Sequence, residues 1–210
     1  MKKVITLIVS LLLIALVTFS SGFINLIPNL VWRIALGVLA NLLNGAIAFV
    51  AIKITKIEIG LDLKNWKSYL IGFVIAAALC FVIGVVPTFF GVSFAGQHTP
   101  FTWFEFIYSL LFFVLIVGPV EELVFRVYVQ ETFMSFFGKH KWIGIIIASA
   151  LFGLWHIING SLLQVLFTFG IGLVFGFAKY LLKNCKYVGV ATAHGLYDFS
   201  LVLVKFFILH

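Results

Sequence analysis

Two adjacent carboxylates and an arginine close a strongly apolar run, in residues 118–126 (GPVEELVFR). Ionised groups at mid-membrane cost roughly 2.5–3.5 kcal/mol each on the insertion scale, so we expect these groups to face a protein interior or a water-filled cavity. Glu122 and Arg126 are four residues apart, so a helix places them on one face, where they can pair. Glu121 lies about 100° further round the helix. The spacing therefore predicts one carboxylate held by a cation and a neighbour, Glu121, available for reaction.

Three more ionisable side chains fall well inside apolar segments. They are His156, in the sequence FGLWH, and His194 with Asp198, in the sequence HGLYD. His194 and Asp198 are four residues apart, so the acid can orient or assist the imidazole. Counted at about 1.5 Å per residue from the lysines at the segment ends, His156 and the His194–Asp198 pair fall near the middle of a bilayer. Buried acids and imidazoles of this kind predict a functional site.

The composition is typical of an integral membrane protein. The chain has 210 residues, of which 63% are hydrophobic and 10% charged, whereas about a quarter of a soluble domain is charged. We predict a single integral-membrane domain over residues 1–210, in contact with the lipid bilayer. The net charge of +7 does not predict a nucleic-acid partner, because lysines between spans set orientation and contact anionic lipid headgroups.

The apolar runs predict an all-α fold, a polytopic transmembrane helix bundle with about seven spans (seven to eight) and a buried catalytic cavity. The expected spans are residues 4–24, 30–52, 69–92, 101–120, 142–158, 162–182 and 188–209. Lysines fall in every second connection, which predicts a multi-pass protein of the cell membrane with a cytoplasmic N-terminus. The first span resembles a signal peptide, but the charge alternation favours its retention. Gly170, Gly172 and Gly176 predict a small-residue packing face on the sixth span.

Three motifs on successive spans resemble those of a known family. They are EExxxR, FxxxH and HxxxD, formed by Glu121, Glu122, Arg126, Phe152, His156, His194 and Asp198. Together they resemble the CAAX-protease and bacteriocin-processing family (CPBP or Abi) of intramembrane endopeptidases, in its bacterial branch. The resemblance extends over about residues 103–200 and implies a protease core at about residues 101–208. The last motif of the family ends in Asn or Asp, and the Glu122–Arg126 pair would hold the catalytic helix.

The resemblance implies hydrolysis of a peptide bond in a membrane-associated protein or peptide, in a processing or bacteriocin self-immunity role. Amide hydrolysis needs an activated water, stabilisation of the tetrahedral oxyanion and an acid for the leaving amine. Glu121 would act as the general base on water, helped by His156. His194 and Asp198 would shape the oxyanion side. Because an ionised carboxylate cannot donate to an oxyanion, Asp198 would orient His194 or be protonated.

A zinc-dependent version of the same protease is the alternative mechanism. Glu121, His156 and His194 could serve as three ligands with an open position for water, as catalytic zinc requires. The sequence contains no HExxH motif. We therefore expect that no cofactor is required, with zinc as the alternative.

Two functions of other classes stay open at this point. One is a proton-coupled transporter, because buried carboxylates and histidines also form proton relays; the sequence shows no inverted repeat in support of it. The other is a non-catalytic immunity protein that binds its target. Replacing Glu121 with alanine would abolish proteolysis but leave immunity by binding intact.

Overall fold

The computed structural model describes residues 2–158 and 160–209, and every regular element within these ranges is helical. The prediction of an all-α fold is confirmed. The chain divides into two compact units, which are described separately. The first unit comprises Met1–Gly60 and Val120–Leu182, and the second comprises Leu61–Pro119 and Lys183–His210.

Six helical stretches in the described part of the chain are long and apolar enough to cross a membrane, so the chain is a multi-pass membrane protein. They are Lys2–Leu26, Leu30–Thr55, Trp66–Phe90, Trp103–Trp155, Leu162–Leu181 and Tyr187–Phe207. The count differs from seven because the fourth and fifth predicted spans fall in one stretch, Trp103–Trp155, of 53 residues. Such a helix would be about 80 Å long, well beyond the roughly 30 Å of a hydrocarbon core. Within this stretch the chain turns at Gly138, where φ is +52°.

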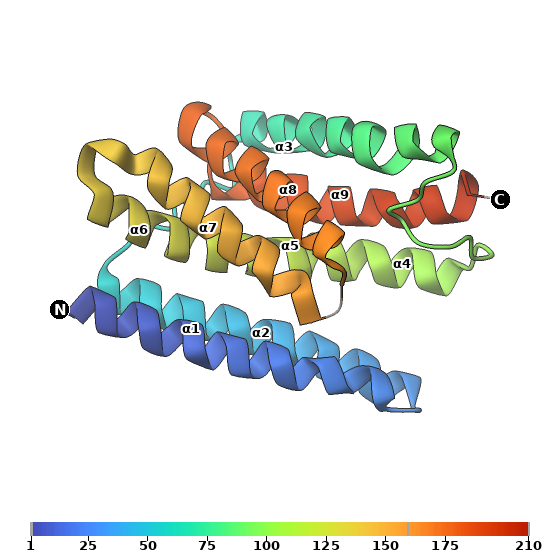
Figure 1. Ribbon diagram of the computed structural model, residues 1–210, viewed down its shortest axis with the longest axis horizontal. Coiled ribbons are helices and arrows are strands. Elements are labelled where there is room, and N and C mark those ends of the chain that lie inside the picture. Colours follow the sequence, from blue (N-terminus) through green and yellow to red (C-terminus); the bar gives the residue numbers. More distant parts are fainter. Residues whose placement is uncertain (1, 159, 210) are drawn as a thin grey trace. The chain divides into compact units, whose positions relative to one another are not determined.

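The first unit is built from two helical hairpins and a further helix. Its helices are α1 (Lys2–Ser21), α2 (Leu30–Thr55), α6 (Gln130–Phe137), α7 (Lys141–Trp155) and α8 (Leu162–Leu181), together with the end of α5 (Gly118–Glu122). Figure 1 shows α1 beside α2, and α6 beside α7. A hydrogen bond of 2.8 Å between the hydroxyls of Ser10 and Tyr128 joins α1 to the segment that follows α5. This unit positions the predicted carboxylates.

The second unit contains α3 (Trp66–Leu79), α4 (Trp103–Phe112) and α9 (Tyr187–Phe207). Close packing of α3 on α9, side by side in Figure 1, depends on glycine, since a Cβ at Gly72 would lie 2.4 Å from the carbonyl oxygen of Gly189. A second close crossing joins Gly118 to Gly195, where an added Cβ on Gly118 would lie 2.6 Å from the backbone nitrogen of Gly195. These contacts fix the part of α9 that contains the HxxxD motif.

Polar caps mark the start of three apolar helices. Asn29 accepts a hydrogen bond from the backbone nitrogen of Trp32 at the start of α2. Thr102 and Ser161 accept equivalent bonds at the starts of α4 and α8. Each cap satisfies a backbone N–H that has no partner within its own helix, so the apolar runs begin at defined residues.

The small-residue face of α8 packs against α7 as predicted, with one exception. A Cβ on Gly172 would lie 3.1 Å from the side chains of Phe152 and Ser149, and a Cβ on Gly176 would lie 2.6 Å from Cγ2 of Ile145. Gly170 has no atom within 4 Å of the position of its Cβ. The prediction was wrong for Gly170, because it lies six residues before Gly176 and therefore faces away from the GxxxG ridge.

Candidate active site

The carboxylates of the EExxxR motif lie at an irregular point of a continuous helix. Glu121 and Glu122 end the short helix α5, which is flanked by two π-helical segments, Phe113–Val117 and Leu123–Val129. Pro119 has no N–H and its ring crowds the carbonyl four residues earlier, so a regular α-helix is disfavoured there. The chain remains helical through the proline by widening its turns on both sides. Single π-helical turns are rare and concentrate at functional sites.

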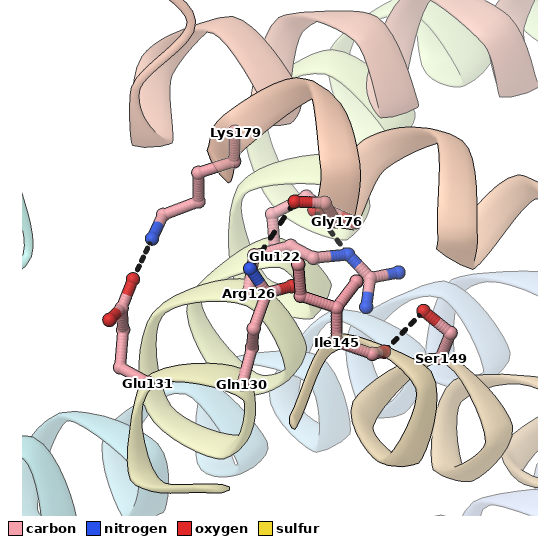
Figure 2. Close-up of polar contacts among 8 residues, drawn as sticks. All are labelled: Glu122, Arg126, Gln130, Glu131, Ile145, Ser149, Gly176 and Lys179. Carbon is pink, nitrogen blue, oxygen red and sulfur yellow. Dashed lines mark hydrogen bonds and ion pairs between the residues drawn. The ribbon is translucent and has the colours of Figure 1, made fainter. Parts of the chain in front are cut away.

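Glu122 and Arg126 form the predicted ion pair in the interior of the first unit. Both side chains are 0% exposed, and Nε of Arg126 lies 3.2 Å from Oε2 of Glu122 (Figure 2). These two atoms do not form a hydrogen bond with each other, so the attraction between them is ionic. The guanidinium carbon also lies 4.9 Å from the ring centroid of Phe152. The aromatic face adds a cation–π contact to a charge that is fully removed from solvent.

The polar contacts continue from the EExxxR motif along α6 toward α8. Nε2 of Gln130 donates a 3.3 Å hydrogen bond to the carbonyl oxygen of Gly176, and Lys179 forms an ion pair with Glu131 (Figure 2). Arg126 and Gln130 are four residues apart and so follow one side of the helix. These contacts tie the segment after Glu122 to α8 and hold its register within the first unit.

The FxxxH motif has a physical basis in the same unit. The ring of Phe152 contacts Arg126 on one side and lies 5.0 Å from the ring of His156, at an angle of 77°. Nδ1 of His156 lies 2.9 Å from the carbonyl oxygen of Phe152. A carbonyl oxygen only accepts, so Nδ1 must carry a hydrogen. In the neutral imidazole the other nitrogen, Nε2, is then an acceptor that can receive a hydrogen bond or a proton.

Glu121 and His156 line one cavity of about 200 Å³, which lies wholly within the first unit. Its wall is formed by Thr18, Ser21, Ala40, Asn41, Asn44, Val120, Glu121, Val124, Phe125, Trp155 and His156. The structure therefore brings together the two side chains to which the resemblance gives the water-activating role. A cavity of this size accommodates several water molecules beside a carboxylate and an imidazole.

A larger apolar cavity of about 470 Å³ adjoins the polar one. It is lined mostly by aliphatic side chains of α1 and α7, and it shares Thr18, Val124, Phe125 and Trp155 with the cavity that contains Glu121. An apolar space of this kind accommodates an aliphatic chain or an apolar peptide side chain. The candidate site thus has a polar chamber and an apolar neighbour with common walls.

His194 and Asp198 form the predicted pair on one face of α9, in the second unit. Nε2 of His194 lies 3.4 Å from Oδ2 of Asp198, and the two side chains are 4% and 23% exposed. The prediction that they pair is confirmed. The other four predicted site residues belong to the first unit, so the expectation that all six act on one substrate stays a prediction.

The three ligands considered for zinc, Glu121, His156 and His194, do not all belong to one unit, so the zinc alternative stays a proposal. Across residues 2–158 and 160–209, no three side chains of His, Cys, Asp or Glu lie close enough together to hold a metal ion. Catalytic zinc requires three protein ligands and an open position. The first unit supplies only two of the ligands considered for zinc, Glu121 and His156.

The first hundred residues contain none of the three motifs and no predicted site residue, yet α1 and α2 form one wall of the cavity. Thr18 and Asn44 line it, and Nδ2 of Asn44 donates a 3.2 Å hydrogen bond to Oγ1 of Thr18. A signal was present, because Asn41 and Asn44 are amides in the apolar middle of a predicted span. Polar side chains inside transmembrane helices face the bundle interior or a cavity.

Comparison with known proteins links residues 101–200 to a known family. Residues 101–200 match the sequence model of the family described as "Type II CAAX prenyl endopeptidase Rce1-like". This segment contains the EExxxR, FxxxH and HxxxD motifs. No curated protein and no solved structure matches the chain. Through residues 101–200 the chain is similar to the Rce1-like type II CAAX endopeptidase family, and this similarity, on a chain with six apolar helical stretches, indicates a membrane-embedded peptide hydrolase.

Proposed function

We propose that the protein hydrolyses a peptide bond of a membrane-associated protein or peptide, using water that is activated by Glu121 without a metal ion. The observation that carries the proposal is that Glu121 and His156 line one cavity of about 200 Å³. A general base needs to lie within hydrogen-bond reach of the water that it deprotonates. The bond from His156 Nδ1 to Phe152 directs the accepting Nε2 away from its own helix, which suits a partner for that water.

In the proposed reaction Glu121 takes a proton from water while the water oxygen bonds to the carbonyl carbon of the peptide. The electron pair of the carbonyl π bond moves onto its oxygen and gives a tetrahedral oxyanion. The C–O double bond then re-forms and the C–N bond breaks, while protonated Glu121 returns its proton to the departing nitrogen. Water is the only co-reactant. His156 orients the water through Nε2, and His194, which faces Asp198 through Nε2, donates to the oxyanion through Nδ1 when the imidazole is protonated.

The substrate class follows from the setting of the site. A bilayer-embedded hydrolase with an apolar space beside its polar chamber suits a substrate with an apolar segment or a lipid-like chain. A prenylated protein, a peptide precursor and the membrane anchor of a regulator all have this character. We propose a processing or bacteriocin self-immunity role in the cell membrane, with the N-terminus cytoplasmic, which the alternating lysines support.

Isotope labelling of the product tests the reaction class. The purified protein in detergent is incubated with an apolar peptide in water enriched in oxygen-18, and the products are analysed by mass spectrometry. The wild type should place one heavy oxygen in the new carboxylate, and Glu121→Gln should give no product. Glu131→Gln is the matched control, because Glu131 pairs with Lys179 and does not line the cavity. Equal cleavage by wild type and Glu121→Gln would refute the proposal.

A cellular experiment separates proteolytic self-immunity from immunity by binding. Cells that produce Glu121→Gln at the level of the wild type are exposed to a bacteriocin against which the wild type protects. If protection depends on proteolysis, it should disappear in the variant. Protection that survives would contradict a proteolytic immunity role.

A further inference from the structure

Asn44 is one of the polar side chains of the cavity wall that the reaction scheme above does not use. It lies on α2, is 7% exposed and lines the same cavity as Glu121 and His156. A Cβ on the next residue, Gly45, would lie 3.3 Å from Cγ2 of Val120. The close approach of α2 to Val120, which precedes Glu121, holds the amide at this wall of the chamber.

The hydrogen-bonding groups of Asn44 are only partly used. Nδ2 donates one hydrogen to Oγ1 of Thr18, and the described residues give Oδ1 no hydrogen bond. They also give the second hydrogen of Nδ2 no acceptor. Asn41 differs, although it lies one turn earlier and lines the same cavity, because its Nδ2 bonds to the carbonyl oxygen of Gly37 in its own helix. An amide buried with unused hydrogen-bonding groups is unfavourable, so Asn44 is suited to a polar occupant of the cavity.

We propose that Asn44 is a catalytic residue that donates its second Nδ2 hydrogen to the carbonyl oxygen of the scissile peptide as that oxygen becomes an oxyanion. This inference rests on the proposed hydrolase function. Amide hydrolysis needs an N–H or O–H donor at the oxyanion, and side-chain amides serve in this way. An ionised Asp198 only accepts, and a neutral His194 that donates to Asp198 through Nε2 has no second hydrogen, so the HxxxD motif donates to an oxyanion only when His194 is protonated. Asn44 supplies a further donor from α2, outside the segment that matches the family.

Steady-state kinetics with a peptide substrate test the role of the Asn44 amide. Asn44→Asp keeps the shape of the side chain and removes both amide hydrogens, and Asn44→Leu removes all its polar atoms. Each variant should lower kcat about 100-fold and leave KM within about threefold, because the donor acts in the transition state. An unchanged kcat, or a raised KM with an unchanged kcat, would overturn the inference.

Thr18→Val separates this role from a structural tether between α1 and α2. The variant removes the only hydrogen bond that the described residues give the Asn44 side chain but keeps the amide itself. Its kcat should fall much less than that of Asn44→Asp. If Thr18→Val loses as much kcat as Asn44→Asp, Asn44 is a tether and the inference fails. Thermal unfolding in detergent identifies any variant that has lost activity by failing to fold.

Binding of a peptide aldehyde gives a readout besides turnover. The hydrated aldehyde resembles the tetrahedral intermediate, whereas the matching peptide amide resembles the ground state. The wild type should bind the aldehyde more tightly, and Asn44→Leu should lose that preference while binding the amide as the wild type does. One outcome is that the wild type cleaves the peptide and Glu121→Gln does not. If Asn44→Leu then keeps the preference for the aldehyde, only the role of Asn44 is refuted. If the wild type neither cleaves nor binds the aldehyde, the proposed function is refuted and this inference with it.

Discussion

Nδ1 of His156 lies 2.9 Å from the carbonyl oxygen of Phe152, one helical turn earlier. The imidazole is thereby anchored to its own helix and presents Nε2 as the nitrogen without hydrogen. Because a metal ligand and a hydrogen-bond acceptor both use a nitrogen without hydrogen, this contact determines which ring nitrogen reacts. The proposed role of His156, which orients the water through Nε2, depends on that orientation of the ring.

We predict that neutral His156 is the tautomer with hydrogen on Nδ1. Nitrogen-15 NMR of the histidine-labelled protein in lipid should show Nδ1 protonated and Nε2 not protonated. His140, exposed in the connection between α6 and α7, is the reference for an imidazole without this constraint. A neutral ring with hydrogen on Nε2 would contradict the prediction, since Nδ1 could not then donate to Phe152.

We predict that Glu122, unlike Glu121, acts mainly in stability. Glu122→Gln leaves the charge of Arg126 buried without its counter-ion, which should lower the free energy of unfolding by about 3–5 kcal/mol. The double variant Glu122→Leu with Arg126→Met removes both charges and should recover much of that loss. Denaturant unfolding in mixed micelles measures both. If the double variant is less stable than Glu122→Gln, the attraction within the ion pair outweighs the cost of removing its two charges from water. The ion pair itself then stabilises the unit.

We predict opposite effects of alanine at two glycines of α8. Gly176→Ala places a Cβ 2.6 Å from Cγ2 of Ile145, which should destabilise the protein by about 1–3 kcal/mol. Gly170→Ala points into open space and should be neutral or stabilising by up to about 1 kcal/mol, because alanine favours helix. Thermal unfolding in one detergent compares them. Equal loss in both variants would mean that α8 does not pack through the GxxxG ridge.

We predict that Asp198 acts through its carboxylate oxygen Oδ2, which lies 3.4 Å from Nε2 of His194. Asp198→Asn keeps an oxygen acceptor and should retain activity within about tenfold of the wild type, whereas Asp198→Leu removes both oxygens and should lose far more. The measurement is kcat on one peptide for the two variants. If Asp198→Asn is as inactive as Asp198→Leu, the negative charge of Asp198 is required and not only its oxygen.

Features set by spacing along one helix could be predicted from the sequence. The Glu122–Arg126 and His194–Asp198 pairs are both four residues apart, and both form, because that spacing alone brings side chains together on a helix. The apolar runs likewise predicted the spans, since length and hydropathy decide which segments cross a bilayer.

Features that depend on packing between distant segments could not be predicted. The amides of α2 signal a buried face, but that Asn44 and Thr18 share a cavity with Glu121 depends on the packing of α2 against Val120 at Gly45, which the hydropathy of α2 does not reveal. The π-helical turns around Pro119 depend on how the flanking residues pack. The bond from His156 to Phe152 requires one rotamer of the imidazole, and spacing does not choose a rotamer.

The measurement that tests the central claim most directly is cleavage of an apolar peptide by the wild type and Glu121→Gln, each with and without a zinc chelator. The account predicts that the wild type cleaves equally with and without chelator. Glu121→Gln should be slower by at least about 100-fold in both conditions, the range expected for loss of a general base. Wild-type cleavage abolished by chelator and restored by zinc would contradict the metal-free mechanism. Cleavage by Glu121→Gln at the rate of the wild type would contradict the role of Glu121 itself.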